Sequence, residues 1–185
     1  MESEKKHAMT FLLQNPAIST DKQDIYAWLC KKMLSCVKPV PFFLFYDLNP
    51  MLHYQIEFDD YRQHLIHVTL RFLANPNQEL WLPTWIPGSY LIREFAKHIE
   101  SVTASDEAGR ILNIKKTAKN RWQLFNTDHE LITVEYDVYA YDLSVRGAYV
   151  DQTRLYVNPA CVCLALQDQA QSPCEVELFL PDELK

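Results

Sequence analysis

Residues 80–95 read L-W-L-P-T-W-I-P-G-S-Y-L-I-R-E-F, and this stretch limits the fold more than any other part of the 185-residue chain. Trp81 and Trp85 alternate here with Pro83 and Pro87. Because proline fixes φ and lacks a backbone donor, the segment around Pro83 cannot continue as a central strand. The stretch therefore predicts large rings held in stiff, turn-rich backbone, which either cap one end of a β-domain core or line a cleft.

The second half of the same stretch predicts a tight turn. Pro87 and Gly88 suit the two central positions of a type II turn, where glycine tolerates a positive φ. Ser89 can then bond to the local backbone and begin a short helical turn over residues 90–92. We expect a preorganised tip at this place in the chain.

Outward from this stretch, apolar and polar residues alternate, which is the pattern of half-buried strands. The alternation starts at His53, and it is cleanest over residues 132–140. Asn75-Pro76-Asn77 predicts a turn that closes an earlier strand. Short strands linked by short connections indicate a mostly β fold, an antiparallel β-sandwich or saddle-shaped sheet. The expected strands not flanking a hairpin turn are 54–58, 66–72, 155–157, 162–166 and 176–180.

Two hairpins are predicted from turn residues between apolar runs. Asp106-Glu-Ala-Gly109 separates the runs 99–103 and 111–115. Asn126-Thr127-Asp128 separates the runs 121–125 and 132–140 in the same way. We expect each pair of runs to form neighbouring strands.

The first fifty residues follow a different pattern. Residues 1–18 are weakly patterned, and we expect them to be poorly ordered. Apolar residues then recur at helical spacing, which predicts one helix over about 21–37 that ends before Pro39. Residues 1–50 are therefore predicted to be an N-terminal extension, or a mis-assigned start, in front of a β-domain at 51–185.

Composition excludes several classes of function. The net charge of −6 argues against nucleic-acid and anionic-membrane binding, since both need clustered Lys and Arg. No run reaches the roughly eighteen apolar residues of a membrane-spanning helix, and the start does not resemble a secretory signal. Five cysteines without a repeating pattern indicate free thiols, so we expect a cytoplasmic location.

Three groups of metal-ligating residue types occur, and none has the spacing of a site. His129-Glu130 begins like a zinc helix, but position i+4 is Thr133 and the segment starts a predicted strand. His64 and His67 are three apart, so on one strand they point to opposite faces, and we expect an edge or core histidine and a solvated one. We expect Cys161, Cys163 and Cys174 to be small buried hydrophobes. We therefore predict that this chain binds no metal ion.

A second motif, V-R-G-A-Y-V-D-Q-T-R at 145–154, carries several charges. Tyr149 and Asp151 share a face of an alternating strand, so a ring with a carboxylate beside it can meet a cationic group. The alternative is a structural ion pair, for instance of Arg93 with Asp151, that fixes the tryptophan loop to the sheet. The candidates for an ion pair or a domain seam are Arg93, Glu94, Arg146, Tyr149, Asp151 and Arg154.

Together, W-I-P-G-S-Y-L-I-R-E-F-A-K-H-I at 85–99 and the motif at 145–154 resemble the N-terminal domain of the M61 family of metallopeptidases, the glycyl aminopeptidases. The likeness runs from about His53 to the end of the sequence. It implies a non-catalytic domain that packs beside a catalytic domain and narrows one end of its cleft. It also implies that the zinc, with its H-E-x-x-H helix, belongs to that catalytic domain, which we expect to be missing from this chain. No H-E-x-x-H occurs here, so we expect no catalytic residue and no peptidase activity from this chain alone.

The resemblance also implies peptide substrates with small N-terminal residues, bound by the parent enzyme. We expect Trp81 to be buried and the tip to face the cleft. The candidate cleft residues are Trp85, Pro87, Gly88, Ser89 and Tyr90. Two other classes stay open: a free-standing sandwich module that binds a peptide or sugar through exposed aromatics, and a truncated fragment without independent activity.

Overall fold

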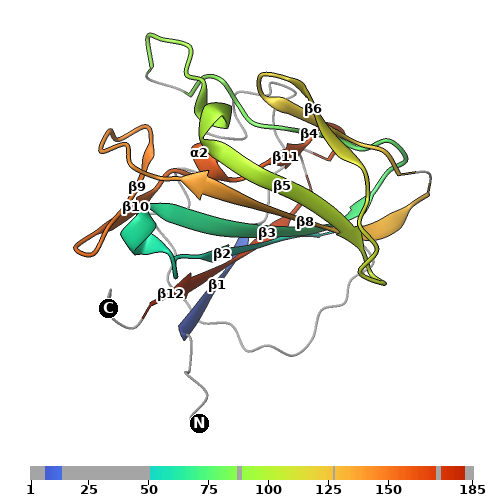
Figure 1. The fold of residues 1–185 in the computed structure, drawn as a ribbon, viewed down its shortest axis with the longest axis horizontal. Helices are drawn as coiled ribbons and strands as arrows, with labels where there is room; N and C mark the ends of the chain where they lie inside the picture. The colour runs from blue at the N-terminus through green and yellow to red at the C-terminus, as the bar shows by residue number, and fades with distance from the viewer. Residues whose placement is uncertain (1–6, 14–50, 87–88, 127, 170–171, 182–185) are drawn as a thin grey trace.

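The computed structural model describes residues 7–13, 51–86, 89–126, 128–169 and 172–181, and strands dominate them (Figure 1). The short helices are η1 (Tyr61–Gln63), η2 (Phe95–His98) and α2 (Pro159–Val162). None of these helices has the length and apolar character needed to cross a bilayer. The strands are β1 (His7–Leu13), β2 (Leu52–Glu57), β3 (Leu65–Ala74), β4 (Glu79–Trp81), β5 (Ile99–Asp106), β6 (Ile114–Ala118), β7 (Arg121–Leu124), β8 (Glu130–Tyr139), β9 (Ala148–Val150), β10 (Leu155–Val157), β11 (Ala165–Leu166) and β12 (Cys174–Leu180).

The strands form a six-stranded sheet in the order β1-β12-β2-β3-β8-β5, a four-stranded sheet in the order β11-β4-β7-β6, and the hairpin β9-β10. All pairs are antiparallel except β12 with β2, which run parallel. The predicted mostly β, largely antiparallel fold is therefore confirmed. The parallel pair was not foreseen, because it joins strands more than a hundred residues apart in the sequence.

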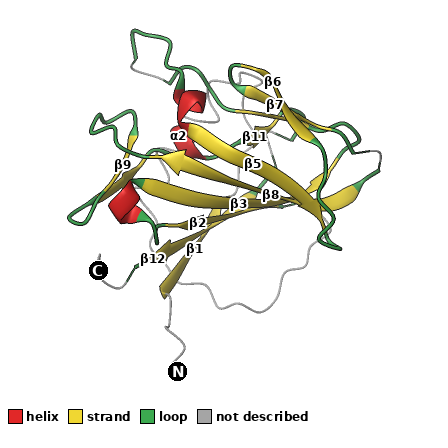
Figure 2. Cartoon of the chain, in the orientation of Figure 1, coloured by secondary structure: helices red, strands yellow, loops and turns green. Residues whose placement is uncertain are grey.

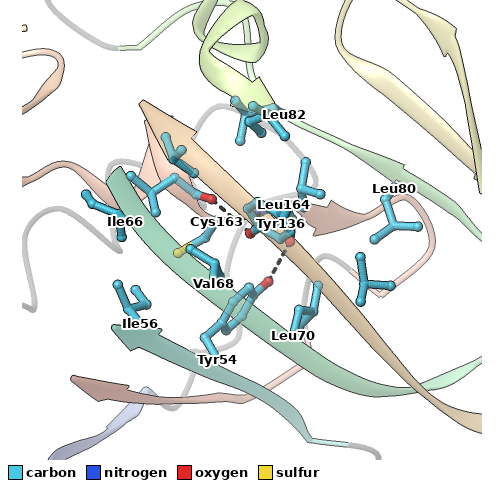
Figure 3. Packing of buried hydrophobic residues seen from close by; sticks show 14 of the residues in the cluster. Tyr54, Ile56, Ile66, Val68, Leu70, Leu80, Leu82, Tyr136, Cys163 and Leu164 are labelled. Carbon is cyan, nitrogen blue, oxygen red and sulfur yellow. Dashed lines mark hydrogen bonds between the residues drawn. The ribbon is translucent and has the colours of Figure 1, made fainter. Parts of the chain in front are cut away.

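Inward-facing side chains of both sheets belong to one buried cluster, which makes the architecture a sandwich (Figure 3). The alternation predicted from sequence sets this core, since every second residue of β2, β3 and β8 is buried. The fully buried side chains include Ile56, Phe58, Ile66, Leu70, Phe72, Leu80, Leu82, Leu124, Ile132, Tyr136, Leu164 and Leu166.

The first predicted hairpin is confirmed only next to its turn, where Ser105 and Ile111 form an antiparallel bridge and the Leu112 amide donates to the Ala104 carbonyl at 2.8 Å. The strand that follows this turn, β6, pairs with β7 in the smaller sheet and not with β5, so the longer pairing was wrong. β7 and β8 likewise lie in different sheets. At that crossing the buried Asn126 side chain donates to the carbonyls of Asn75 (3.0 Å) and Asp128 (2.9 Å). Each connection moves the chain from one sheet to the other, because both sheets must bury a face against the same core.

The predicted strand at 162–166 is also mostly wrong. Asn158 caps α2, its side chain accepting from the Ala160 amide at 3.1 Å, and Pro159 opens the helix. Only Ala165–Leu166 is a strand. Cys161 and Cys163 therefore lie on and just after a helix instead of sharing a strand face.

At the start of the chain, residues 7–13 form β1, which pairs with β12 along its whole length. The expectation of poor order over residues 1–18 is wrong for this strand. The predicted helix at 21–37 lies outside the described residues.

Candidate functional site

The segment that leads into η2 projects from the top of the molecule, and the β9–β10 hairpin lies at its left (Figure 1 and Figure 2). We call the described residues 82–86 and 89–94 the tip loop. Its base is closed by the Arg93 amide, which donates to the Thr84 carbonyl at 2.5 Å. The strand β4 ends at Trp81, before Pro83, as proline chemistry predicts.

The tip loop is braced from inside by two side chains. The indole Nε1–H of Trp85 donates to the Ser89 carbonyl at 2.7 Å. The Ser89 hydroxyl donates to the Leu91 carbonyl (2.9 Å) and accepts from the Leu91 amide (3.3 Å). The local bonding predicted for Ser89 is confirmed, but residues 90–92 form no helical turn, since Tyr90 and Leu91 are bends, and the 3-10 helix begins only at Phe95.

Exposure divides the tip loop sharply. Tyr90 is fully exposed, and Leu91 and Ile92 are 65% and 77% exposed, whereas Ser89 is buried and Trp85 is half-buried. Pro87 and Gly88 lie outside the described residues. Trp81 was predicted to be buried, but its side chain is only half-buried. It points to the opposite face of the chain from Leu80 and Leu82, which are fully buried.

The charged residues at the end of the tip loop have local partners. Glu94 accepts from the Lys119 ammonium at 2.6 Å, and this contact lowers the pKa of the Glu94 carboxyl. The Arg93 guanidinium approaches the Ser89 hydroxyl at 3.5 Å. The Arg93–Asp151 ion pair is not formed within the described part of the chain, so that example was wrong.

The turn between β9 and β10 is organised by Asp151. Its carboxylate accepts from the Thr153 amide (2.7 Å), the Thr153 hydroxyl (2.8 Å) and the Arg154 amide (2.9 Å). The Tyr149 hydroxyl donates to the second carboxylate oxygen at 2.8 Å, as the shared face predicted. These bonds, those of Thr153 first, lower the pKa of Asp151, while the same contact raises the pKa of Tyr149. The Asp151 carboxylate thus stabilises its own turn. A role at a domain seam stays a prediction for all six candidates.

An aromatic cluster next to this hairpin was missed from the sequence. His64 Nδ1 lies 2.6 Å from the Val150 carbonyl, and because a carbonyl only accepts, this nitrogen must carry the hydrogen. The imidazole lies 4.1 Å from the Tyr141 ring, which stacks on Tyr149 at 5.3 Å. The available signal was the spacing of Tyr139, the last residue of β8, and Tyr141, which places both rings on one face of the chain.

A notch opens between η2 and the segment 138–148. The notch is small, with a cavity volume of about 10 Å³. It is lined by Phe95, His98, Val138, Tyr139, Asp142, Gly147, Ala148 and Cys161. Burial, and then the nearby Lys97, lower the pKa of His98. The notch thus holds an imidazole and a carboxylate within mostly apolar walls.

The metal-ligating residue types are dispersed. His64 precedes β3, while His67 lies on it and pairs with Asp137 at 2.9 Å. His129 is exposed in front of β8. Within the described ranges, no three His, Cys, Asp or Glu side chains are placed to hold one metal ion.

The three cysteines of the described residues are reduced. Burial raises the pKa of the Cys163 thiol, and it raises that of Cys174 to about 11. The expectation of buried thiols is confirmed for Cys161 and Cys163, whereas Cys174 is only partly buried.

The comparison with protein families decides the relationship. The model of the peptidase M61 N-terminal domain matches residues 53–185. The chain belongs to the M61 peptidase family. It supplies the N-terminal domain of that family, as the two sequence motifs predicted.

Solved structures agree with this assignment. A crystal structure of an aminopeptidase N family protein from Idiomarina loihiensis is 48% identical to this M61 domain, with a TM-score of 0.68. The match covers 72% of this chain and 22% of that one, so the chain spans less than a quarter of its relative. The search of curated proteins found no match.

Proposed function

We propose that this M61 domain is the non-catalytic N-terminal part of a zinc aminopeptidase, which packs beside a catalytic domain and shapes one end of the substrate cleft. The zinc ligands and the catalytic glutamate belong to that catalytic domain. The substrates are peptides that begin with a small residue such as glycine or alanine. The family match and the M61-type motifs support this reading, with no peptidase activity expected from the chain alone.

The observation that carries the proposal is the exposed Tyr90 on a braced loop. A side chain that is fully exposed contributes little to the stability of its own domain. The backbone beneath it is nevertheless held by the Trp85 indole and the Ser89 hydroxyl. A ring on preorganised backbone offers a contact surface whose ordering cost is already met in the free domain. If the tip lines the substrate cleft, the exposed ring of Tyr90 is in a position to contact the bound peptide.

A chimera tests the proposal. Residues 53–185 replace the matching segment of the Idiomarina loihiensis protein, and cleavage of glycyl and alanyl p-nitroanilides is measured together with bound zinc. We expect an active, zinc-loaded chimera in which Tyr90→Ala lowers kcat/KM by about tenfold, equal to about 1.4 kcal/mol of transition-state stabilisation.

Two results would contradict parts of the proposal. Unchanged kinetics of the Tyr90→Ala chimera would remove the tip from the cleft. Saturable binding of a glycyl peptide to the isolated 185-residue chain, together with an inactive but folded chimera, would instead identify a free-standing binding module.

A further inference from the structure

Exposed apolar side chains are concentrated in two segments of the described chain. Twelve large hydrophobic residues are exposed among the described residues, and eight of them lie in the tip loop or between residues 139 and 156. We name the second group the docking edge, which consists of Tyr139, Tyr141, Leu143, Val145 and Tyr156. Leu143 and Val145 are 66% and 73% exposed. Such a gathering is typical of an interaction surface, whereas single exposed hydrophobics are ordinary.

The loop that carries Leu143 and Val145 is closed on itself. The Asp142 amide donates to the Ala148 carbonyl at 2.9 Å, and the Gly147 amide donates to the Ser144 carbonyl at 3.1 Å. The Asp142 carboxylate accepts from the Ser144 amide at 2.9 Å. A Cβ on Gly147 would lie 2.6 Å from an Asp142 carboxylate oxygen, so only glycine allows the carboxylate to fill this loop.

Two bonds from outside fix the same loop to the rest of the domain. The Tyr156 hydroxyl donates to the Val145 carbonyl at 2.6 Å. The Cys161 thiol donates to the Arg146 carbonyl at 2.8 Å. The backbone therefore holds Leu143 and Val145 away from the core. Their exposure is a property of the folded domain, and a partner surface that covers them gains the burial free energy.

The residues that line the notch beside this loop indicate which chemical groups a partner surface needs. Asp142 lines it together with the rings of His98 and Tyr139. A two-fold contact between copies of this chain, centred on the notch, would bring two Asp142 carboxylates together, which is unfavourable. A complementary surface is apolar, with a cation or an N–H donor opposite Asp142.

We propose that the docking edge is the surface on which the catalytic part of an M61 peptidase packs, with a basic or N–H-bearing group seated at the notch. The inference rests on the proposed function and deepens it by naming the seam. This N-terminal domain spans 22% of its Idiomarina loihiensis relative, so most of that relative's chain lies outside the match and can supply the cover.

The full-length chimera described above tests the seam by calorimetry, a measurement that needs no enzymatic activity. Leu143→Asp combined with Val145→Asp places two charges in the seam. Ile111→Asp is the matched control, since Ile111 is 78% exposed. Ile111 bridges to Ser105, which pairs with Thr133 near the start of β8, whereas the docking edge begins at the end of that strand. We expect the double variant to split a single unfolding transition into two, or to lower the melting temperature by about 5 °C or more. The control should leave the transition unchanged.

Equal melting of the double variant and the control would overturn the docking edge. In the 185-residue chain alone, the double variant should melt like the unchanged chain, which separates a lost seam from a damaged domain. An inactive chimera whose melting still depends on Leu143 and Val145 would contradict the proposed function and keep the seam. A chimera whose activity depends on Tyr90, but whose melting temperature is unaffected by Leu143→Asp with Val145→Asp, would support the proposed function and contradict the seam.

Discussion

At the scale of single residues, Trp85 both packs part of its ring and donates a hydrogen bond that holds the tip loop. The sequence alone does not separate these two roles. Its ring is half-buried, and its indole N–H makes a directed bond to the Ser89 carbonyl. Sequence reasoning located this residue through its prolines and neighbouring aromatics. It could not give its degree of burial, because burial depends on which face of a short, bent segment meets the core.

Substitutions in the tip loop should therefore have graded effects on stability. Trp85→Phe keeps most of the ring and removes the N–H, so we expect a loss of about 1 kcal/mol in the free energy of unfolding. Trp85→Ala also removes partly buried ring area and should cost about 2–3 kcal/mol. Tyr90→Ala, at a fully exposed position, should change stability by less than about 0.5 kcal/mol. Urea unfolding of the three variants gives these values. Equal large losses from Trp85→Ala and Tyr90→Ala would mean that the tip is part of the core.

At the scale of elements, two tyrosines connect the six-stranded sheet to the segment from α2 to β11 (Figure 3). The Tyr136 hydroxyl donates to the Val162 carbonyl (2.9 Å) and accepts from the Leu164 amide (3.0 Å). The Tyr54 hydroxyl donates to the Leu164 carbonyl at 2.7 Å. These bonds satisfy buried backbone groups that have no sheet partner, which explains why polar rings lie in the centre of an apolar core.

Tyr136→Phe should consequently be costly for so small a change. It leaves the Val162 carbonyl and the Leu164 amide without this hydroxyl, at an expected loss of about 1–3 kcal/mol. Tyr139→Phe is the matched control on the same strand, because Tyr139 is 40% exposed, and we expect less than about 0.5 kcal/mol there. Thermal unfolding of both variants decides the matter, and equal melting temperatures would show that the hydroxyl of Tyr136 is dispensable.

The turn at Asp151 predicts a dependence of stability on pH. The folded state lowers the pKa of this carboxyl below its ordinary value of about 3.9. A lowered pKa stabilises the fold above the unfolded value, and this contribution is lost as the pH falls from about 4 toward the folded value. Asp151→Asn should reduce stability at pH 7, and the difference from the unchanged chain should shrink below pH 4. Unfolding curves between pH 7 and pH 2 check this, and a difference that stays constant would contradict the assignment.

The elements that the sequence predicts well are those whose burial is set locally. The alternation in β2, β3 and β8 marks the buried face without knowledge of any partner. The partners of β6 and β7 were wrong, because turn residues such as Asp106 and Asn126 serve a crossing between sheets as readily as a hairpin. The docking edge was missed because Tyr141, Leu143 and Val145 lie beyond the predicted strand 132–140, and their exposure depends on neighbours that are distant in the sequence.

At the scale of the whole molecule, the N-terminal strand changes what truncation should do. β1 covers the outer edge of β12 from His7 to Leu13. A chain that starts at Met51 keeps the other five strands of the larger sheet and both faces of the core. It also leaves the edge of β12 unpaired, and unpaired edges promote association between chains.

We therefore expect the chain starting at Met51 to fold with a stability loss of about 2 kcal/mol, a shift of roughly 4–8 °C, and to self-associate weakly. Deletion of residues 1–6, which lie before β1, is the control and should change neither property. Calorimetry and sedimentation measure both. Aggregation without a cooperative transition would show that residues 7–50 are required for folding, while an unchanged melt would show that β1 adds nothing.

The position of β12 also sets an order of assembly during synthesis. Among the described strands, β1 comes first in the sequence and β12 last, yet β12 lies between β1 and β2 and is the one described strand that pairs with β1. The described pairing of β1 therefore forms only after β12 has been synthesised, about 160 residues beyond the end of β1. Contacts this distant in sequence form slowly, and strands that wait for them are open to pairing with other nascent chains. A chaperone that shields residues 7–13 until Cys174–Leu180 emerges would raise the yield of this protein more than one that acts on the finished chain.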